Sequence, residues 1–211
     1  MTKEERIAGI LPALKREYPL AECTLEETDP WKLLVQVRLA AQCTDERVNM
    51  VTPALFERFP DSVAMAEAPV EEVEDYIHSC GFYHGKARDI VLCARRLQEV
   101  YGGRVPDTME ALLTLPGVGR KSANLILGDV YNVPGSVVVD THCIRLSNRM
   151  GLVDNEKEPV KIEKQLRALL PPEKSNDFCH RLVLHGRAVC TARKTFCEKC
   201  CCGPFCKTLN R

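Results

Sequence analysis

The feature that most restricts the fold of this chain is a short glycine turn between two apolar helical segments. The turn reads Pro-Gly-Val-Gly at residues 116–119, and leucines precede it at positions 112, 113 and 115. Residues 120–131 follow it with apolar side chains at helical spacing. Glycines let a backbone turn tightly and let another molecule approach closely. The sequence therefore predicts a helix–hairpin–helix over about residues 108–131.

The hairpin would also present backbone N–H groups that lack a partner within a helix. Such groups, at a turn that contains Gly117 and Gly119 and leads into a helix, form a natural anion site. A DNA phosphate fits a site of this kind. A purely structural turn between two helices is the alternative interpretation of the same residues.

Helix start and stop signals recur along the whole chain. Asp29 followed by Pro30, then Asp61 and Pro69, each precede a helical pattern, and Gly102-Gly103 ends another. The best strand candidate, residues 136–139, is too short for a sheet. The pattern predicts an all-α protein of about ten short helices. Besides the N-terminal segment, the expected helices cover residues 31–42, 62–68, 70–80, 84–101, 108–115, 120–131, 141–151, 160–170 and 177–190.

The overall charge limits the kinds of partner that the protein can bind. The 211 residues contain 29 Lys plus Arg and 29 Asp plus Glu, so the formal net charge is zero. A uniformly basic surface is excluded, and an anionic partner must meet a local patch. The N-terminal segment looks like an amphipathic helix and not a signal peptide, and no apolar run approaches the ~18 residues of a membrane span. We expect a soluble intracellular protein.

Cysteine is unusually abundant, with 12 residues in the chain. Six are scattered and are expected to be buried small hydrophobic residues: Cys23, Cys43, Cys80, Cys93, Cys143 and Cys179. The other six lie in the last 22 residues. Four of these, separated by six, two and five residues, could hold zinc or an iron–sulfur cluster, and spacing alone does not choose between them: Cys190, Cys197, Cys200 and Cys206.

Two further residues are candidates for chemistry. Lys121 lies in the first turn of the second hairpin helix, where positive charge is disfavoured, so its amine should lose its proton more readily and become a nucleophile. A solvated or phosphate-contacting lysine is the alternative. Asp140 follows an apolar run and precedes Thr141. It could cap the next helix, or cap it and also present a carboxylate to a cleft.

Together these segments resemble the helix–hairpin–helix DNA glycosylases and, within them, the endonuclease III family. The resemblance covers nearly the whole chain. It implies that residues 22–132 form a helical barrel with the hairpin, that residues 1–21 plus 133–211 form a cluster domain, and that the active cleft lies between these two helical subdomains. The segments that carry it, in the family's order and spacing, are LAAQCTDERVN (39–49), GFYHGKA (81–87), LPGVGRKSAN (115–124), VDTH (139–142), LHGR (184–187) and the final cysteines.

The resemblance implies a mechanism for these residues. The Lys121 amine attacks C1′ of a flipped-out nucleotide, and Asp140 deprotonates the lysine or stabilises the cationic sugar. Gln42 enters the base stack, and Phe82 wedges beside it. The alternatives are a helix-terminal polar residue for Gln42 and a core aromatic for Phe82. The family often carries an aliphatic residue in place of Phe82.

The resemblance also implies a cofactor and DNA contacts. The 6-2-5 cysteine spacing matches the family's [4Fe–4S] loop, and Cys201 and Cys202 are additional thiols. Arg193 and Lys194, between the first two cysteine ligands, would meet DNA phosphates unless they belong to an ordinary solvated loop. The hairpin residues expected to bind DNA are Gly117, Gly119 and Arg120.

The implied function is a bifunctional DNA glycosylase and abasic-site lyase in base excision repair. Its expected partner is double-stranded DNA with an oxidised pyrimidine such as thymine glycol, or with an abasic site. A monofunctional mismatch or adenine glycosylase is disfavoured because Lys121 is present. A noncatalytic DNA-binding module is disfavoured by Lys121 and Asp140 together. We expect a monomer in the cytoplasm of a bacterium or archaeon, associated with the nucleoid.

Overall fold

The computed structural model describes residues 1–210, and Arg211, which the sequence assigns to the cluster domain, lies outside them. Within this range the secondary structure consists of eleven α-helices and three short 3-10 helices, without a β-strand. The only extended pairing among these residues is an isolated bridge between Cys190 and Thr195. The predicted all-α fold is confirmed.

The chain divides into two compact units, one formed by residues 24–131 and the other by residues 1–23 together with 132–211. The assignment of a barrel role and a cluster role to these two parts stays a prediction. The first unit contains α2 (Pro30–Leu39), α3 (Asp45–Arg58), α4 (Ser62–Glu67), α5 (Val70–Ile77), α6 (Tyr83–Tyr101), α7 (Met109–Leu112) and α8 (Arg120–Asp129). The second contains α1 (Lys3–Glu17), α9 (Thr141–Met150), α10 (Pro159–Leu169), η1 (Pro172–Lys174), α11 (Ser175–Ala188), η2 (Cys197–Lys199) and η3 (Gly203–Phe205).

The predicted helix starts rest on local side-chain caps. The Asp29 side chain accepts a hydrogen bond from the Lys32 N–H at the start of α2, and Pro30 is the first residue of that helix. Asp61 accepts one from the Ala64 N–H at the start of α4. Because each cap contacts only its own first turn, these boundaries could be predicted from sequence.

The helices differ from the prediction in several places. Two of the helices, predicted over residues 31–42 and 70–80, end three residues earlier, at Leu39 and Ile77. The sequence pattern did not identify α3, although Thr44 caps it and Asp45 and Glu46 follow in its first turn. The predicted helix over residues 108–115 ends at Leu112. Tight turns replace it, with the Leu115 N–H bonded to the Leu112 carbonyl, because a residue before a proline disfavours helical geometry.

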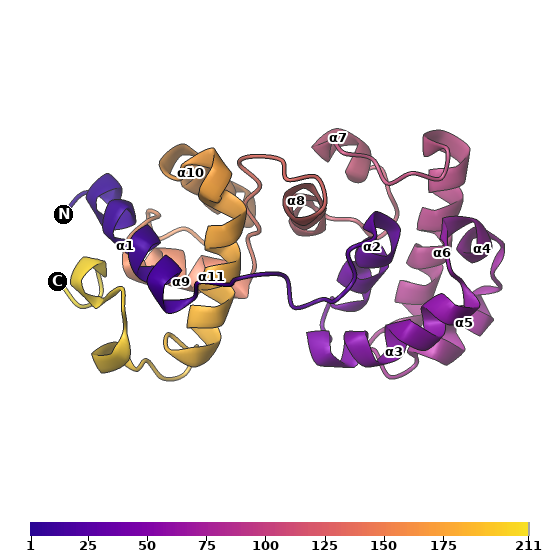
Figure 1. Ribbon diagram of the computed structural model, residues 1–211, viewed down its shortest axis with the longest axis horizontal. Coiled ribbons are helices and arrows are strands. Elements are labelled where there is room, and N and C mark those ends of the chain that lie inside the picture. Colours follow the sequence, from indigo (N-terminus) through magenta and orange to yellow (C-terminus); the bar gives the residue numbers. More distant parts are fainter. Residues whose placement is uncertain (211) are drawn as a thin grey trace. The chain divides into compact units, whose positions relative to one another are not determined.

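Helix α6 is the centre of the first unit. It lies against α4 and α5 (Figure 1) and contributes buried Ile90, Val91, Ala94 and Leu97. Its ends are defined by left-handed residues on both sides, Phe82 before it and Gly102 after it. The packing of α6 in this core therefore fixes the position of the turn that contains Phe82.

In the second unit the two ends of the chain meet. Helix α1 packs on η3 so closely that a Cβ at Gly9 would lie 2.3 Å from the Phe205 ring. The Arg6 guanidinium donates a hydrogen bond of 2.7 Å to the Phe205 carbonyl. Helices α9 and α11 pack together at Gly186, where a Cβ would meet the His142 ring at 2.3 Å. This packing brings the segments VDTH and LHGR into contact.

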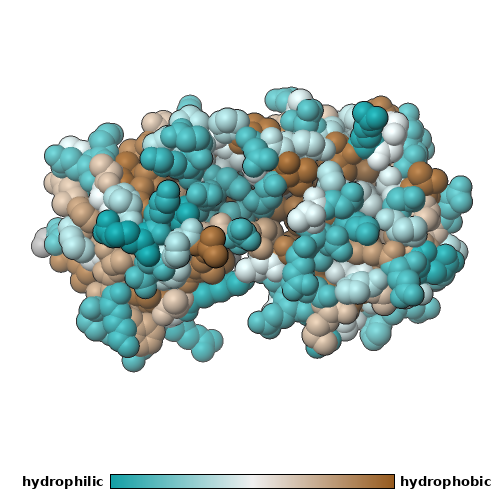
Figure 2. Space-filling model, viewed as in Figure 1, coloured by the Kyte–Doolittle hydropathy of each residue, from teal (hydrophilic) through white to brown (hydrophobic). Residues whose placement is uncertain are grey.

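The scattered cysteines follow the prediction only in part. Cys80, Cys93, Cys143 and Cys179 are buried, but Cys23 and Cys43 are half-buried, so the prediction of burial was wrong for these two. Hydrophilic residues predominate on the face in Figure 2, with hydrophobic residues scattered among them. No helix in residues 1–210 is both long enough and apolar enough to span a bilayer.

Candidate functional site

The hairpin depends on glycine at one position in particular. Gly117 has a φ of 74°, which side-chain-bearing residues rarely adopt. A Cβ there would lie 2.7 Å from Arg38 Nε and 2.9 Å from Asp89 Cβ. Arg38 and Asp89 form an ion pair, with Nε 2.8 Å from Oδ2. This pair packs against Gly117 and so supports the hairpin. Nothing in the sequence pattern identified either partner.

The other hairpin glycine leaves an open approach to a helix start. Gly119 is the N-cap of α8, and no side chain caps the helix there. No described atom lies within 4 Å of a Cβ built on Gly119, neighbouring residues aside. The first N–H groups of α8 are therefore available to an anion. Arg120, the first residue of this helix, is half-buried and has interactions with the rest of the chain.

Lys121 follows in the first turn of the same helix. Its side chain is exposed, while the opposite face of α8 is buried through Ala123, Ile126 and Leu127. Within residues 1–210 the Lys121 side chain makes no hydrogen bond or ion pair. The amine is therefore not required to hold the fold together.

Asp140 is the N-cap of α9 in the second unit. Its Oδ1 accepts a hydrogen bond of 2.7 Å from the Cys143 N–H, so the capping interpretation is confirmed. Its side chain is half-buried, and Oδ2 makes no hydrogen bond within the part of the chain described. One oxygen fixes the carboxylate, and the other is left for another partner.

Helix α9 connects Asp140 to the cysteine-rich loop. Arg145 Nε donates a hydrogen bond of 3.2 Å to the Cys190 carbonyl. One turn later, Arg149 Nη1 lies 3.3 Å from Cys190 Sγ and 2.7 Å from the Thr191 carbonyl oxygen. The two arginines share one helix face because they are four residues apart. The sequence interpretation missed both, and that spacing was the only available signal.

The four predicted cysteine ligands share the wall of one pocket in the second unit. Apolar side chains form much of the rest of this wall, among them Met150, Val189, Phe196 and Leu209. Within residues 1–210, no group of three or more His, Cys, Asp or Glu side chains is arranged to hold a single metal ion. The thiols that line the pocket are Cys190, Cys197, Cys200 and Cys206.

The two additional thiols lie apart from that pocket wall. Cys202 is fully buried, and its Sγ is 3.7 Å from Cys201 Sγ. Cys200 Sγ lies 3.3 Å from His185 Nε2. Hydrogen bonds from the Cys202 thiol and then from His185 lower the pKa of Cys200 to about 4. The pKa of Cys202 is raised in turn, first by its hydrogen bond to Cys200 and then by that to Cys201.

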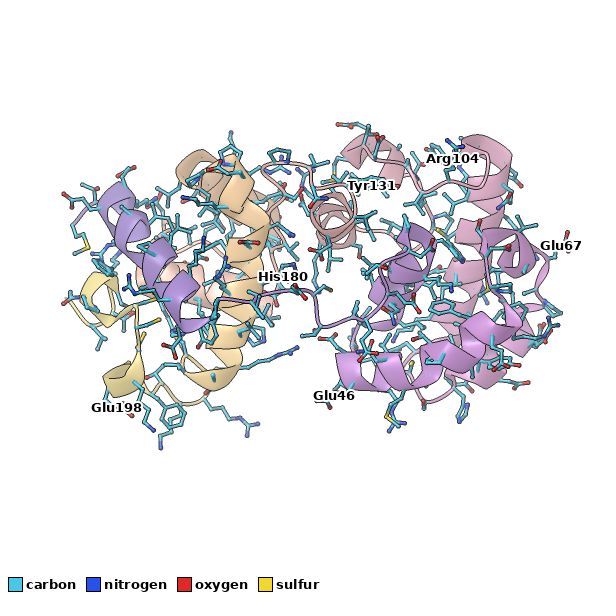
Figure 3. The ribbon with its side chains drawn as sticks, in the orientation of Figure 1. Glu46, Glu67, Arg104, Tyr131, His180 and Glu198 are labelled. Carbon is cyan, nitrogen blue, oxygen red and sulfur yellow. The ribbon has the colours of Figure 1, made fainter. Side chains whose placement is uncertain are left out.

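The basic residues between the first two cysteines lie on a tight exposed turn. Arg193 and Lys194 are both exposed, and the Thr191 hydroxyl accepts a hydrogen bond from the Lys194 N–H. Lys194 Nζ lies 4.9 Å from the centre of the Phe196 ring. Glu198, labelled in Figure 3, follows in the same loop. Both cations are open to solvent, as phosphate contacts require.

Gln42 and Phe82 lie close together in the first unit. Both adopt left-handed backbone geometry, with φ of 55° and 59°, which is uncommon for residues of these types. Phe82 is 72% exposed, so the core-aromatic interpretation is wrong. Gln42 is exposed in the turn between α2 and α3 (Glu46, in the first turn of α3, is labelled in Figure 3). A Cβ on Gly81 would lie 3.5 Å from the Gln42 carbonyl oxygen, so the two turns touch.

The comparisons with known proteins agree on one family. Residues 35–172 match the HhH-GPD superfamily of base excision DNA repair proteins. Endonuclease III of Synechocystis sp. is 47% identical over 199 residues, which are 94% of this chain and 90% of that protein. Endonuclease III of Bacillus subtilis is 38% identical over 95% of this chain and 91% of that protein.

The chain belongs to the endonuclease III family. A solved structure of a trapped endonuclease III–DNA covalent intermediate matches it with a TM-score of 0.93 and 36% identity. That match covers 100% of this chain and 98% of the solved one. The helix–hairpin–helix glycosylase fold predicted from the sequence is therefore confirmed for this endonuclease III family member, and base excision repair is its biochemical context.

Proposed function

We propose that this protein is a bifunctional DNA glycosylase and abasic-site lyase whose nucleophile is Lys121. The observation that carries the proposal is the position of this lysine. It is exposed in the first turn of the hairpin's second helix, beside an uncapped helix start that can hold a phosphate. A DNA backbone held by those N–H groups would lie within reach of the lysine.

The proposed reaction proceeds in two steps. The neutral Lys121 amine attacks C1′ of the flipped-out nucleotide, and the bond from C1′ to the damaged base breaks. The sugar ring opens to give a Schiff base between C1′ and the lysine nitrogen. Loss of the C2′ proton then breaks the C3′–O bond, which cleaves the strand 3′ to the lesion by β-elimination.

Asp140 assists this chemistry as a carboxylate at a fixed position. Its Oδ1 is held by the Cys143 N–H, so the group would need little reorganisation when charge develops. Its Oδ2 would take the lysine proton or stabilise the cationic sugar.

Gln42 and Phe82 would fill the gap that the flipped-out nucleotide leaves in the duplex. Their exposure and their adjacent left-handed turns support this proposal. Both residue types cost free energy in that backbone geometry, and Phe82 also exposes a large apolar ring to water. A site that separates stacked bases would make use of the left-handed turns and of the exposed ring.

Gln42→Ala and Phe82→Ala should impair excision of a damaged base more than cleavage of a preformed abasic site. Extrusion costs a few kcal/mol, and least where the base is already missing. Incision rates on a thymine glycol duplex and on an abasic duplex, measured side by side, provide the comparison. Equal losses on both substrates, at unchanged thermal stability, would contradict a role in extrusion. Leu113→Ala, at another exposed apolar residue of the same unit, is the matched control.

We further propose that Cys190, Cys197, Cys200 and Cys206 hold a [4Fe–4S] cluster. All four thiols line one pocket, and their 6-2-5 spacing is the one that the resemblance assigns to a [4Fe–4S] loop. A cubane binds each thiolate through a separate iron, which suits thiols spread around a pocket wall. When bound, the cluster would cross-link the loop. Arg149 and His185 would then donate hydrogen bonds to the ligand sulfurs of Cys190 and Cys200.

The purified protein should be yellow-brown and contain about four iron atoms per chain. Cys197→Ser should lower the iron content, whereas Cys201→Ser should retain it, because Cys201 does not line the pocket. Iron analysis and the visible absorption spectrum provide the measurement. A colourless protein with one zinc ion per chain would overturn the assignment.

The proposed partner is double-stranded DNA that contains an oxidised pyrimidine or an abasic site. Because the net charge is zero, binding must rely on local cations. The exposed Arg193 and Lys194 would contact phosphates, and so would the hairpin residues Gly117, Gly119 and Arg120. We propose that the protein acts as a monomer in the cytoplasm, in association with the nucleoid.

Borohydride trapping on a thymine glycol duplex tests the proposed function. Borohydride reduces the Schiff base and leaves the protein covalently bound to DNA, and the adduct is seen as a shifted band under denaturing conditions. Base release without a trapped adduct would support a monofunctional glycosylase instead. Binding without base release or strand cleavage would support a noncatalytic module.

A further inference from the structure

A buried ammonium group lies beside two thiols that the proposed mechanism does not use. Lys86, in the first turn of α6, is 1% exposed, and its Nζ donates a hydrogen bond of 2.7 Å to the Leu39 carbonyl oxygen. No carboxylate pairs with it within residues 1–210. Burial lowers the pKa of Lys86, while the adjacent thiols Cys43 and Cys80 favour its charged form. A buried cation without an acidic partner stabilises a thiolate nearby.

The two thiols lie on turns that touch one another. Cys43 lies in the turn between α2 and α3, and Cys80 lies in the turn between α5 and α6. Burial and then the Cys43 thiol raise the pKa of Cys80, and the cations Lys86 and Arg47 lower it, so these three side chains lie near Cys80. Because the turns touch, a local movement can bring the two sulfurs to the sulfur–sulfur bond length of about 2.05 Å.

The exposure of the two sulfurs differs in a way that suits stepwise oxidation. Cys43 is half-buried and can meet a small solute, whereas Cys80 is fully buried. Burial, and then the neighbouring Cys43, raise the pKa of Cys80 to about 11, so its thiol keeps its proton until Cys43 reacts. Cys43 is therefore the sulfur that an oxidant reaches, and Cys80 is the one that resolves the product.

The positions of this pair link it to the two residues proposed to enter the duplex. Gln42 immediately precedes Cys43, and Phe82 follows Cys80 by two residues. The two turns already touch where Gly81 approaches the Gln42 carbonyl oxygen. A covalent bond between the thiols would therefore join the two turns at their bases.

We propose that Cys43 and Cys80 form a reversible disulfide that restrains the turns carrying Gln42 and Phe82. The oxidant is hydrogen peroxide. The Cys43 thiolate attacks one peroxide oxygen, which breaks the O–O bond and gives Cys43 sulfenic acid and water after protonation. Cys80 sulfur then attacks Cys43 sulfur, forming the S–S bond and releasing a second water. The two thiols lose two electrons in total, and the peroxide is reduced.

The disulfide would reduce extrusion of the damaged nucleotide, a consequence that rests on the proposed function. A displacement of about 1 Å at a positioning residue can cost 10²-fold in rate. Excision of thymine glycol should therefore fall about tenfold or more after oxidation. Cleavage of an abasic site should change less, because little extrusion work remains there.

The test begins with a peptide map of the full-length protein before and after treatment with hydrogen peroxide. Trypsin releases Cys43 within residues 39–47 and Cys80 within residues 59–86, and each peptide has a single cysteine. A cross-linked peptide should appear after oxidation and disappear with dithiothreitol. Cys143 and Cys179 are the internal control. The Cys179 side chain and then burial raise the pKa of Cys143, and both thiols are buried and should stay unlinked.

The second part compares the incision rates of oxidised wild type and oxidised Cys43→Ser on both substrates. Any damage to a cluster affects the two proteins alike, so only the wild type should show the selective, reductant-reversible loss on thymine glycol. Cys80→Ala serves as the second variant should Cys43→Ser fold poorly.

A map without the 39–47 to 59–86 cross-link would overturn the disulfide. A cross-link with equal rates before and after oxidation would overturn the restraint of the turns. Absence of incision in the untreated enzyme would contradict the proposed function alone, because the map does not depend on activity.

Discussion

Lys121→Ala should abolish the borohydride-trapped adduct and leave DNA binding intact. The amine is the only group in the proposal that bonds covalently to C1′, so no residual Schiff base is expected from this position. The substitution should change the free energy of unfolding by no more than about 0.5 kcal/mol, because Lys121 is exposed and alanine is a good helix former. Trapping and gel-shift binding on the same thymine glycol duplex are the two measurements.

Lys164→Ala is the matched control for that experiment. Lys164 is also an exposed helical lysine, on α10, and its removal should leave trapping unchanged. An undiminished adduct in Lys121→Ala would show that another amine is the nucleophile. Loss of the adduct together with loss of binding would make Lys121 a phosphate contact, as the alternative interpretation of the sequence holds.

Asp140→Asn should reduce base excision by ~10²-fold or more while the protein stays folded. Asparagine caps helices about as well as aspartate, so the bond to the Cys143 N–H can be kept while the negative charge is lost. The substitution therefore separates the capping role from the chemical role. Single-turnover rates and thermal unfolding of the same preparations provide the two quantities.

Asp61→Asn is the control for the cap itself. Asp61 caps α4 through a hydrogen bond of 2.8 Å from the Ala64 N–H, and it has no proposed part in the chemistry. Its excision rate should match the wild type. If Asp140→Asn also keeps the wild-type rate per folded molecule, then Asp140 is only a cap.

Most of the helices could be predicted because their signals are local. Asp29, Asp61 and Asp140 each cap a helix through an N–H three residues further along the chain, and such bonds form whatever the rest of the chain does. Helix α3 was missed although Thr44 caps it in the same way. Its residues carry charge and two internal polar positions that obscure the apolar spacing, and only packing against its neighbours reveals the buried face.

The candidate site could be identified from sequence only as a set of residue types in an order. Lys121, Asp140 and the four cysteines were proposed in this way, and their roles stay predictions. The residue type alone could not decide between the wedge and the core-aromatic interpretation of Phe82, because phenylalanine is more often buried, and the structure shows it exposed. Arg145 and Arg149 were missed because their partners are carbonyls and a thiol about 40 residues away in sequence.

The sequence by itself determined the all-α class, the hairpin and the cysteine spacing, since each depends on residues within a few positions of one another. Only the tertiary structure decided what lies against these elements. It placed the Arg38–Asp89 ion pair beneath Gly117, joined the turns of Gln42 and Phe82, and brought Cys43 against Cys80. Such contacts join distant segments, and their free energy exists only after the chain has lost the conformational entropy that folding costs. No local pattern along the sequence records which distant segments will meet.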